Sequence, residues 1–244
     1  MRPPVFVAPT AELAGERVTL RGPEGKHAST VRRLTPGERV DLTDGAGLIV
    51  ECVVAAARPA ELDLTVCARR AEPPPQPRIA ILQAIPKGDR GELAVELMTE
   101  AGADVIVPWA AQRSVSVWRG DRAARSLARW ISTAQQAAKQ SRRSWFPEVT
   151  EQADLAAAAR RISAAALAIV LDPDAPEPLT AAAVPAEGEV VLVIGPEGGI
   201  SPAENDAFLA AGAVMARLGP TVMRASSAGA VAAGVLLSRT ARWA

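Results

Sequence analysis

"VVLVIGPEGGISPAENDAFLAAG", residues 190–212, is an apolar run followed by a loop with three glycines and then by a helical pattern. A continuous apolar run of this kind is typical of a strand buried on both faces of a parallel sheet. Ser201, Pro202 and Glu204 form the pattern of an N-cap, a first-turn proline and a capping box. The stretch therefore predicts a strand–loop–helix unit of an α/β fold.

The same alternation extends from residue 78 to the end of the chain. Further strands are expected at 78–86, 103–109, 167–173 and 213–219, and helices at 89–102, 121–141, 154–163 and from about Arg224 onward. Ligands of such sheets bind at the carboxyl ends of the strands. Three of these ends carry glycine or proline loops, which read LDPDAPE (171–177), IGPEGG (194–199) and LGPTVMR (218–224).

Residues 1–70 have a different pattern, with short β-prone runs separated by Gly, Asp and Pro turns and with one helical piece at 24–34. This pattern predicts a small β-barrel. The stretch AEPPPQP at 71–77 is too rich in proline for regular structure and predicts a linker. We therefore expect a barrel domain at 1–70, a linker at 71–77 and an α/β domain at 78–244.

Composition excludes several classes of protein. No apolar run reaches the length of a membrane span, and the first residues lack the pattern of a secretory signal, so a cytoplasmic protein without a membrane segment is expected. The chain has one histidine, His27, and two cysteines, Cys52 and Cys67. Their spacing matches no metal site, so no metal is expected, and the cysteines are interpreted as small buried hydrophobes.

The net charge is zero, but charge is unevenly distributed along the chain. Residues 113–143 contain eight basic residues and one acid, whereas residues 148–206 contain eleven acids and two arginines. The basic segment is suited to a polyanionic partner, or it is an ordinary solvated helix face.

The loop at 195–199 reads GPEGG, which matches neither the dinucleotide fingerprint nor the P-loop. Pro196 has no N–H to offer a phosphate, and Glu197 places a carboxylate where an anion would bind. Two interpretations remain. The loop is a tight turn that requires positive φ, or its bare backbone approaches a flat ring such as an adenosine with a cationic substituent.

The last helix has an unusual face of small residues, which are Ser226, Ala228, Gly229, Ala232, Ala233 and Gly234. Glycine inside a helix costs about 1 kcal/mol relative to alanine. This cost predicts that another backbone approaches the helix closely. The alternative is an ordinary alanine-rich core helix.

Taken together, these motifs resemble the RsmE family, the uridine-N3 methyltransferases of 16S ribosomal RNA in the SPOUT superfamily. The resemblance rests on VLVIGPEGGIS (191–201) and LGPTVMRASSAGAVAA (218–233), preceded by VRRLTPGERVDLTDG (31–45), KGDRGELAVELMTEAGADVIVPW (87–109), QRS (112–114) and RWISTAQQAAKQSRR (129–143). It covers nearly the whole chain. It implies a PUA-like β-barrel that binds RNA, and a catalytic domain with a mostly parallel sheet and a deep trefoil knot.

The resemblance also implies S-adenosylmethionine as the cofactor, a homodimer, and 16S rRNA, within the 30S subunit, as the partner. Transferred to the matching positions, the cofactor-binding residues are Leu171, Ile194, Gly195, Glu197, Gly198, Ile200, Leu218, Gly219, Met223 and Ala228.

Arg224 is the candidate catalytic residue, because an arginine at the cofactor loop can stabilise the anion that forms when uridine N3 loses its proton. Where many family members read Arg-Thr-Glu-Thr-Ala, this chain has Ser226 at the acidic position. The candidate RNA-binding residues are Arg32, Arg33, Lys87, Arg90, Arg113, Arg142 and Arg143.

Three other functions remain as alternatives at this stage. One is a SPOUT methyltransferase acting on the ribose 2′-hydroxyl, against which the KGDR and QRS segments argue. Another is a non-catalytic RNA-binding assembly factor on the same scaffold, which the intact loop at 195–199 disfavours. The third is an enzyme that binds nucleotide phosphates.

Overall fold

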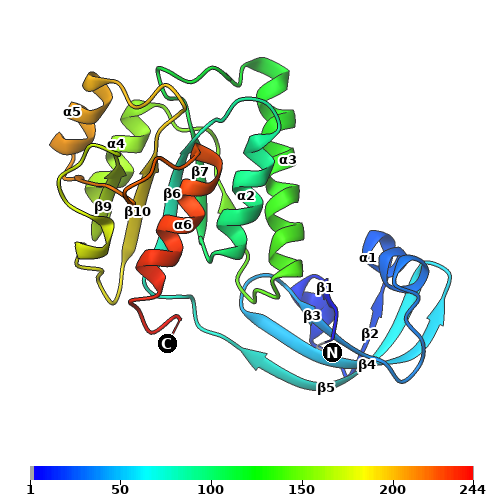
Figure 1. Ribbon diagram of the computed structural model, residues 1–244. Helices are drawn as coiled ribbons and strands as arrows, with labels where there is room; N and C mark the ends of the chain where they lie inside the picture. Colours follow the sequence, from blue (N-terminus) through cyan, green and yellow to red (C-terminus); the bar gives the residue numbers. More distant parts are fainter. Residues whose placement is uncertain (1–2, 244) are drawn as a thin grey trace. The chain divides into compact units, whose positions relative to one another are not determined.

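A six-stranded parallel sheet forms the centre of the larger part of the chain in the computed structural model, which describes residues 3–243 (Figure 1). The order is β11-β9-β10-β6-β7-β8, and every neighbouring pair runs parallel. The strands are β6 Arg78–Ala84, β7 Val105–Trp109, β8 Glu148–Val149, β9 Leu167–Leu171, β10 Glu189–Ile194 and β11 Val214–Ala216. The predicted α/β class and parallel sheet are confirmed.

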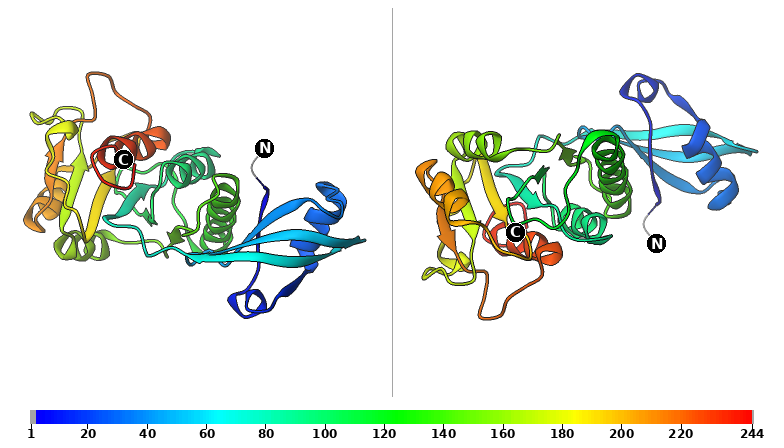
Figure 2. Two further views of the ribbon diagram at one scale, coloured as in Figure 1. Left: turned by 90° about the horizontal axis from the view of Figure 1, so that it is seen from below. Right: turned by 90° about the horizontal axis from the view of Figure 1, so that it is seen from above.

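Helices cover both faces of this sheet (Figures 1 and 2). On one face lie α2 Arg90–Glu100, α3 Gly120–Gln140 and α6 Ala225–Leu237, and on the other α4 Leu155–Ala164 and α5 Pro202–Ala210. A short 3-10 helix, η3 Leu179–Ala181, follows β9. Successive residues of β10 belong to opposite cores, with Leu192 packed among α2 and α6 and Val193 packed among α4 and α5. The uninterrupted apolar run at 190–194 is explained by this double burial.

The glycines of α6 accommodate side chains rather than another backbone. A Cβ on Gly229 would lie 3.0 Å from Sδ of Met98 in α2, and one on Gly234 would lie 3.3 Å from the Trp243 ring. The small face thus lets α2 approach α6 closely, as the glycines predicted, and Met98 fills the space at Gly229.

The N-terminal unit is built on a five-stranded sheet in the order β1-β3-β4-β5-β2. Its elements are β1 Val5–Val7, η1 Thr10–Leu13, β2 Arg17–Leu20, α1 Gly22–Lys26, the π-helix η2 His27–Val31, β3 Arg39–Thr43, β4 Leu48–Arg58 and β5 Glu61–Ala71. The sheet encloses its own core, which includes Phe6, Leu42 and Leu62. This arrangement confirms a small β-domain with one helical insertion.

Residues 139–146 also belong to the N-terminal unit, so the two units are Met1–Pro74 with Lys139–Phe146, and Pro75–Ala138 with Pro147–Ala244. Trp145 donates from Nε1 to the carbonyl of Glu72 at 2.9 Å, and Gly47 donates to the carbonyl of Ser144 at 2.9 Å. The predicted domains, a barrel at 1–70, a linker at 71–77 and an α/β domain at 78–244, do not assign residues 139–146 to the N-terminal unit. Residues 1–2 and 244 of these predicted domains lie outside the described residues.

The two cysteines differ in environment. Cys52 lies in the N-terminal core, and burial raises the pKa of its thiol to about 12, which keeps it protonated and unreactive. Cys67 is exposed, so its expected burial is wrong, because residues 65–71 of β5 lie largely outside that core. Between residues 3 and 243, no helix has the length and hydrophobicity needed to cross a membrane.

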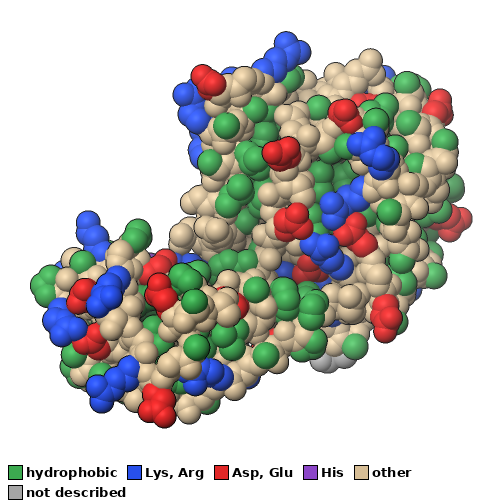
Figure 3. Space-filling view, turned by 180° about the vertical axis from the view of Figure 1, so that it is seen from behind, with side chains coloured by type: hydrophobic (Ala, Val, Ile, Leu, Met, Phe, Trp, Pro, Cys, Tyr) green, Lys and Arg blue, Asp and Glu red, His purple; other side chains and the backbone are tan. Residues whose placement is uncertain are grey.

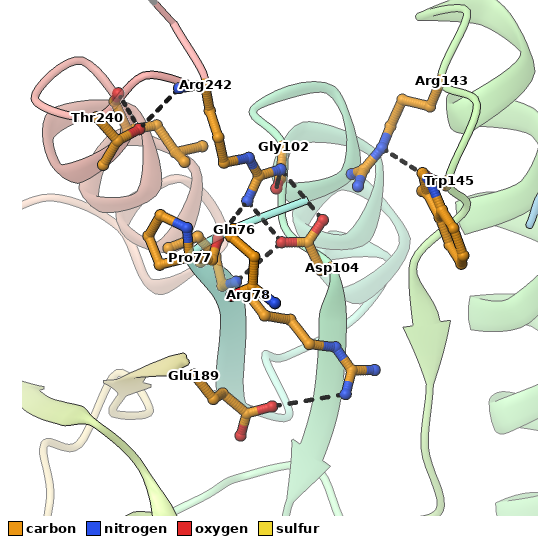
Figure 4. A network of polar contacts seen from close by, with 12 residues as sticks. Gln76, Pro77, Arg78, Gly102, Asp104, Arg143, Trp145, Glu189, Thr240 and Arg242 are labelled. Carbon is orange, nitrogen blue, oxygen red and sulfur yellow. Dashed lines mark hydrogen bonds and ion pairs between the residues drawn. The ribbon is translucent and has the colours of Figure 1, made fainter. Parts of the chain in front are cut away.

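A buried ion pair fixes the end of the chain to the sheet (Figure 4). Arg242 donates from Nη1 to Oδ2 of Asp104 at 2.7 Å and from Nη2 to Oδ1 at 3.2 Å. The same two nitrogens of Arg242 also donate to the carbonyls of Pro77 and Gly102, and Asp104 accepts the N–H of Ile79. The side chains are 14% and 6% exposed. Because the charges are fully hydrogen-bonded, the cost of burying them is offset, and removing one partner leaves an unpaired buried charge.

Replacing Arg242 by alanine is therefore expected to lower the free energy of unfolding by about 3–5 kcal/mol. Arg242→Lys should recover only part of this loss, because an ammonium cannot form the two parallel bonds. Urea unfolding measures both. The matched control is Arg78→Ala, which removes ion pairs to Glu148 and Glu189 from a side chain that is 45% exposed and should cost about 1 kcal/mol or less. Equal losses for Arg242→Ala and Arg78→Ala would contradict this account.

Candidate functional site

The loops that follow β9, β10 and β11 converge on one cavity of about 480 Å³ at the carboxyl edge of the parallel sheet. Drug-sized ligands occupy pockets of roughly 300–1,000 Å³, so the cavity has room for a mononucleoside-sized molecule. Its walls are Arg90, Leu171, Asp172, Pro173, Asp174, Ile194, Gly195, Pro196, Glu197, Gly199, Ile200, Leu218, Gly219, Thr221, Val222, Met223, Arg224, Ala225, Ser226 and Ala228.

Most residues predicted to bind a cofactor meet in this cavity. Those on its wall are Leu171, Ile194, Gly195, Glu197, Ile200, Leu218, Gly219, Met223 and Ala228, together with the candidate catalytic Arg224. Gly198 does not line the cavity. A Cβ there would lie 3.2 Å from both Cβ and the carbonyl oxygen of Arg113, so Gly198 provides room for the loop after β7.

The glycine loop after β10 forms a tight turn that is also a wall of the cavity. Gly199 donates to the carbonyl of Pro196 at 2.9 Å and has a φ of +73°, which favours glycine. A Cβ on Gly195 would lie 2.8 Å from Cγ1 of Ile200, so the bare backbone lets Ile200 fold over the loop. The loop is therefore the expected tight turn, and its approach to a flat ring stays a prediction.

The helix after this loop, α5, begins with the predicted capping box, and Glu204 of that box makes one further contact. Ser201 accepts the N–H of Glu204 at 3.3 Å, and Oε2 of Glu204 accepts the N–H of Ser201 at 2.8 Å. The other carboxylate oxygen, Oε1, accepts the N–H of Gln112 at 2.6 Å. Because Glu204 is only 4% exposed, one buried carboxylate connects the loop after β10 to the loop after β7.

Trp109 fixes the end of β10 from the other side of β6. Its Nε1 donates to the carbonyl of Ile194 at 3.0 Å, and its ring contacts Phe208 of α5 edge-to-face. To reach β10, the indole passes over β6 at Ala84, which is the register partner of Trp109. The small side chain of Ala84 leaves room for the ring. Sequence reasoning missed this role, because a tryptophan at the end of a buried strand is equally typical of an ordinary core residue.

The other two loops of the cavity are connected to each other. Leu179 donates to the carbonyl of Arg217 at 2.8 Å, Arg217 donates to the carbonyl of Glu177 at 2.9 Å, and Asp172 donates to the carbonyl of Ala216 at 3.1 Å. These bonds hold Leu171 and Leu218 on adjacent walls of the cavity.

Charges of both signs surround the cavity. Asp172, Asp174 and Glu197 contribute carboxylates, and Arg90 and Arg224 contribute cations. Arg224 occupies the N-cap position of α6, and in the described chain no hydrogen bond or ion pair holds its guanidinium. Ser226, which also lines the cavity, is 5% exposed. Across residues 3–243 no group of three His, Cys, Asp or Glu side chains is arranged to hold a metal ion.

The predicted RNA-binding residues divide between the two units. Arg32, Arg33, Arg142 and Arg143 belong to the N-terminal unit, and Lys87, Arg90 and Arg113 to the larger one. Arg90 lines the cavity as well. The basic segment 113–143 is not one continuous charged face, because Lys139 forms a 2.6 Å ion pair with Glu24 and is only 8% exposed.

Two family models match the chain. The model of an RNA methyltransferase domain matches residues 72–237, and that of an RNA methyltransferase PUA domain matches residues 20–67. The ribosomal RNA small subunit methyltransferase E of Mycobacterium bovis is 42% identical over 243 residues, which cover 98% of this chain and 93% of the relative.

Two solved structures share the fold. A ribosomal RNA small subunit methyltransferase E of Neisseria gonorrhoeae, bound to S-adenosyl methionine, superposes with a TM-score of 0.85 at 23% identity and covers 98% of both chains. A putative methyltransferase of Legionella pneumophila, in complex with the cofactor SAM, gives a TM-score of 0.84 at 24% identity, covering 98% of this chain and 99% of the other.

The shared carboxylate of Glu204 leads to a prediction about the loop after β7. Glu204→Ala should lower the free energy of unfolding by about 1.5–3 kcal/mol, because hydrogen bonds to a buried charge are lost. The amide of Gln112 should also exchange faster with solvent, which native-state hydrogen exchange measures. Asp206→Ala, an exposed acid on the same helix, is the control and should change stability by no more than about 0.5 kcal/mol. Unchanged protection at Gln112 would show that Glu204 only caps α5.

Proposed function

Because the chain belongs to the ribosomal RNA small subunit methyltransferase E family, we propose that it transfers a methyl group from S-adenosylmethionine to N3 of a uridine in 16S rRNA. The observation that carries this proposal is the convergence of the loops after β9, β10 and β11 on a single cavity. Nearly all positions that match the family's cofactor signature lie on its wall.

The chemistry of the cavity suits S-adenosylmethionine. Leu171, Ile194 and Leu218 offer an apolar surface for an adenine ring, and the bare backbone of Gly195 and Gly219 permits close approach to its polar edge. The cofactor carries a sulfonium and an ammonium, and the carboxylates of Asp172, Asp174 and Glu197 offset this positive charge. When bound, it supplies a methyl group on a positively charged sulfur.

Arg224 is the residue that we propose to act on the nucleotide that receives the methyl group. It lines the cavity, and in the described chain no hydrogen bond or ion pair holds its guanidinium. Removing the N3 proton of uridine spreads negative charge over O2 and O4, and an arginine aimed at these oxygens lowers the barrier electrostatically. Asp172, Asp174 and Glu197 are the carboxylates of the cavity and hence the candidate proton acceptors, since Ser226 offers only a hydroxyl.

N3 lies on the edge that uridine uses for base pairing, so the target must be unpaired or flipped out of a helix. We place the reaction on the 30S subunit in the cytoplasm. The enzyme would act as a homodimer, and the cavity would be enclosed by a trefoil knot. The exposed Val222, Met223 and Val231, near the cavity and on α6, are compatible with a partner subunit there.

Gly219 offers a direct test of cofactor binding. A Cβ at this position would meet no protein atom within 4 Å, yet Gly219 lines the cavity. Gly219→Ala should therefore leave thermal stability unchanged while it weakens S-adenosylmethionine binding, measured by calorimetry. Arg160→Ala, at an exposed position of α4 outside the cavity wall, controls for effects away from the cavity. Undiminished binding by Gly219→Ala would place the cofactor elsewhere.

The reaction itself is tested with purified enzyme, isotopically labelled S-adenosylmethionine and 30S subunits that lack the modification. Nucleoside mass spectrometry should detect 3-methyluridine. Arg224→Ala should lower kcat by about 10²- to 10³-fold, as expected for loss of one oxyanion-stabilising donor, while its affinity for the cofactor is retained. Arg160→Ala, an exposed arginine on α4, is the control.

The fragmentation pattern separates the alternatives. A methyl group retained on the ribose would identify a 2′-O-methyltransferase instead. Cofactor binding without any methylated nucleoside would favour a non-catalytic assembly factor, and full turnover by Arg224→Ala would overturn the role of that arginine.

A further inference from the structure

A second cavity, of about 180 Å³, lies in the same unit between the loop after β6 and the beginning of α3. Its wall includes Asp89, Gly91, Glu92, Trp118, Arg129 and Trp130. No residue of this wall lines the cavity assigned to the cofactor.

Trp118 forms part of the wall and rests on a rigid support. Its ring contacts that of Trp130 edge-to-face, with centroids 5.0 Å apart and an interplanar angle of 81°. Trp130 is buried and packs so closely on α2 that a Cβ on Gly91 would lie 2.9 Å from its Nε1. Trp118 itself is half-buried, so its indole is held in place while part of its surface borders the cavity. A fixed aromatic face is a platform for stacking a nucleobase.

The charges inside the cavity favour a base over a bare phosphate. Arg129 forms an ion pair with Glu92 at 3.1 Å, so one cation is already balanced. Asp89 stands at the N-cap position of α2, but its side chain makes no capping bond. A free carboxylate repels an anion, whereas it accepts hydrogen bonds from the amino or imino groups of a base.

Most of the positive charge lies at the rim of the cavity. Arg119, directly before α3, and Arg122, Arg125 and Arg129, in the first half of α3, are all exposed, and Arg122 and Arg129 also form part of the cavity wall. Figure 3 shows Lys and Arg side chains gathered along that edge of the unit. Arginines in this position neutralise the phosphates of a strand whose base enters the cavity. The rim therefore suits a nucleic-acid backbone, and the interior suits a ring.

The two cavities share one wall, the loop from β6 to α2. Arg90 faces the cofactor cavity, while its neighbours Asp89 and Gly91 line the second one. The N–H of Lys87 donates to Oε1 of Glu197 at 3.4 Å, which joins this loop to the glycine loop. A strand whose target nucleotide enters the first cavity thus passes the second with a neighbouring nucleotide.

We propose that the cavity at Trp118 binds the base of an unpaired nucleotide that neighbours the methylated uridine, with the base stacked on the indole and its backbone held by the arginines of α3. This subsite rests on the proposed function, because it takes part of the same RNA substrate. It adds a second contact to a single strand, and so favours a loop or a bulge over duplex RNA.

Two variants of Trp118 separate stacking from packing. Trp118→Phe keeps an aromatic face, whereas Trp118→Leu keeps an apolar contact with Trp130 and removes that face. The probes are a fluorescein-labelled single-stranded RNA of mixed sequence, followed by anisotropy, and unmodified 30S subunits in steady-state methyl transfer. Trp118→Leu should weaken RNA binding and raise KM for the subunits by about 5- to 150-fold. Trp118→Phe should remain close to the unaltered protein, and kcat should change little in both.

Affinity for S-adenosylmethionine and the thermal midpoint are measured on the same samples. Affinity for the cofactor should stay unchanged in both variants, and the midpoint should fall only slightly in Trp118→Leu, because its ring contact with Trp130 is lost. RNA binding by Trp118→Leu equal to that of the unaltered protein would overturn the subsite, as would equal losses in both variants accompanied by weaker cofactor binding. If the unaltered protein transfers no methyl group but its RNA binding depends on the aromatic ring, the subsite stands and the proposed function fails. If methyl transfer occurs and the variants match the unaltered protein, only the subsite fails.

Discussion

Parallel pairing of β6, β9, β10 and β11 is the constraint on which the site depends. Since all four strands point the same way, the loops that follow them lie at one edge of the sheet. Residues as distant in sequence as Arg90, Leu171, Gly195 and Leu218 thereby line one cavity. The pairing is stable because β10 is apolar on both faces and is covered by α2 and α6 on one side and by α4 and α5 on the other.

Sheet geometry alone does not fix the shape of the loops, and a few buried polar groups do so. The indole N–H of Trp109 holds the last carbonyl of β10, and the carboxylate of Glu204 holds both its own helix start and the loop after β7. Arg242 and Asp104 anchor the opposite end of the sheet to the C-terminal segment. Each of these groups is buried with its hydrogen bonds satisfied, so each favours one arrangement over its alternatives.

Local patterns predict the strands of the parallel sheet other than the two-residue β8, the capping box at Ser201 and the three loops, because each depends on residues a few positions apart. The second contact of Glu204, the return of residues 139–146 to the N-terminal unit and the exposure of Cys67 depend on tertiary packing. The glycines of α6 were recognised as a close-contact face, but their partner, Met98, lies on another helix. The identity of the cofactor rests on resemblance to a family, whereas the argument against a phosphate rests on the residues themselves, namely Pro196, Glu197 and the self-capped helix start at Ser201.

The central claim is that one cavity at the carboxyl edge of the sheet holds the methyl donor. A crystal structure of the protein with S-adenosylmethionine tests it most directly. The account predicts ligand density between Leu171, Gly195 and Leu218, with the methyl group directed toward the side of Arg224. Density at another place, or a ligand bound with these three loops uninvolved, would contradict it.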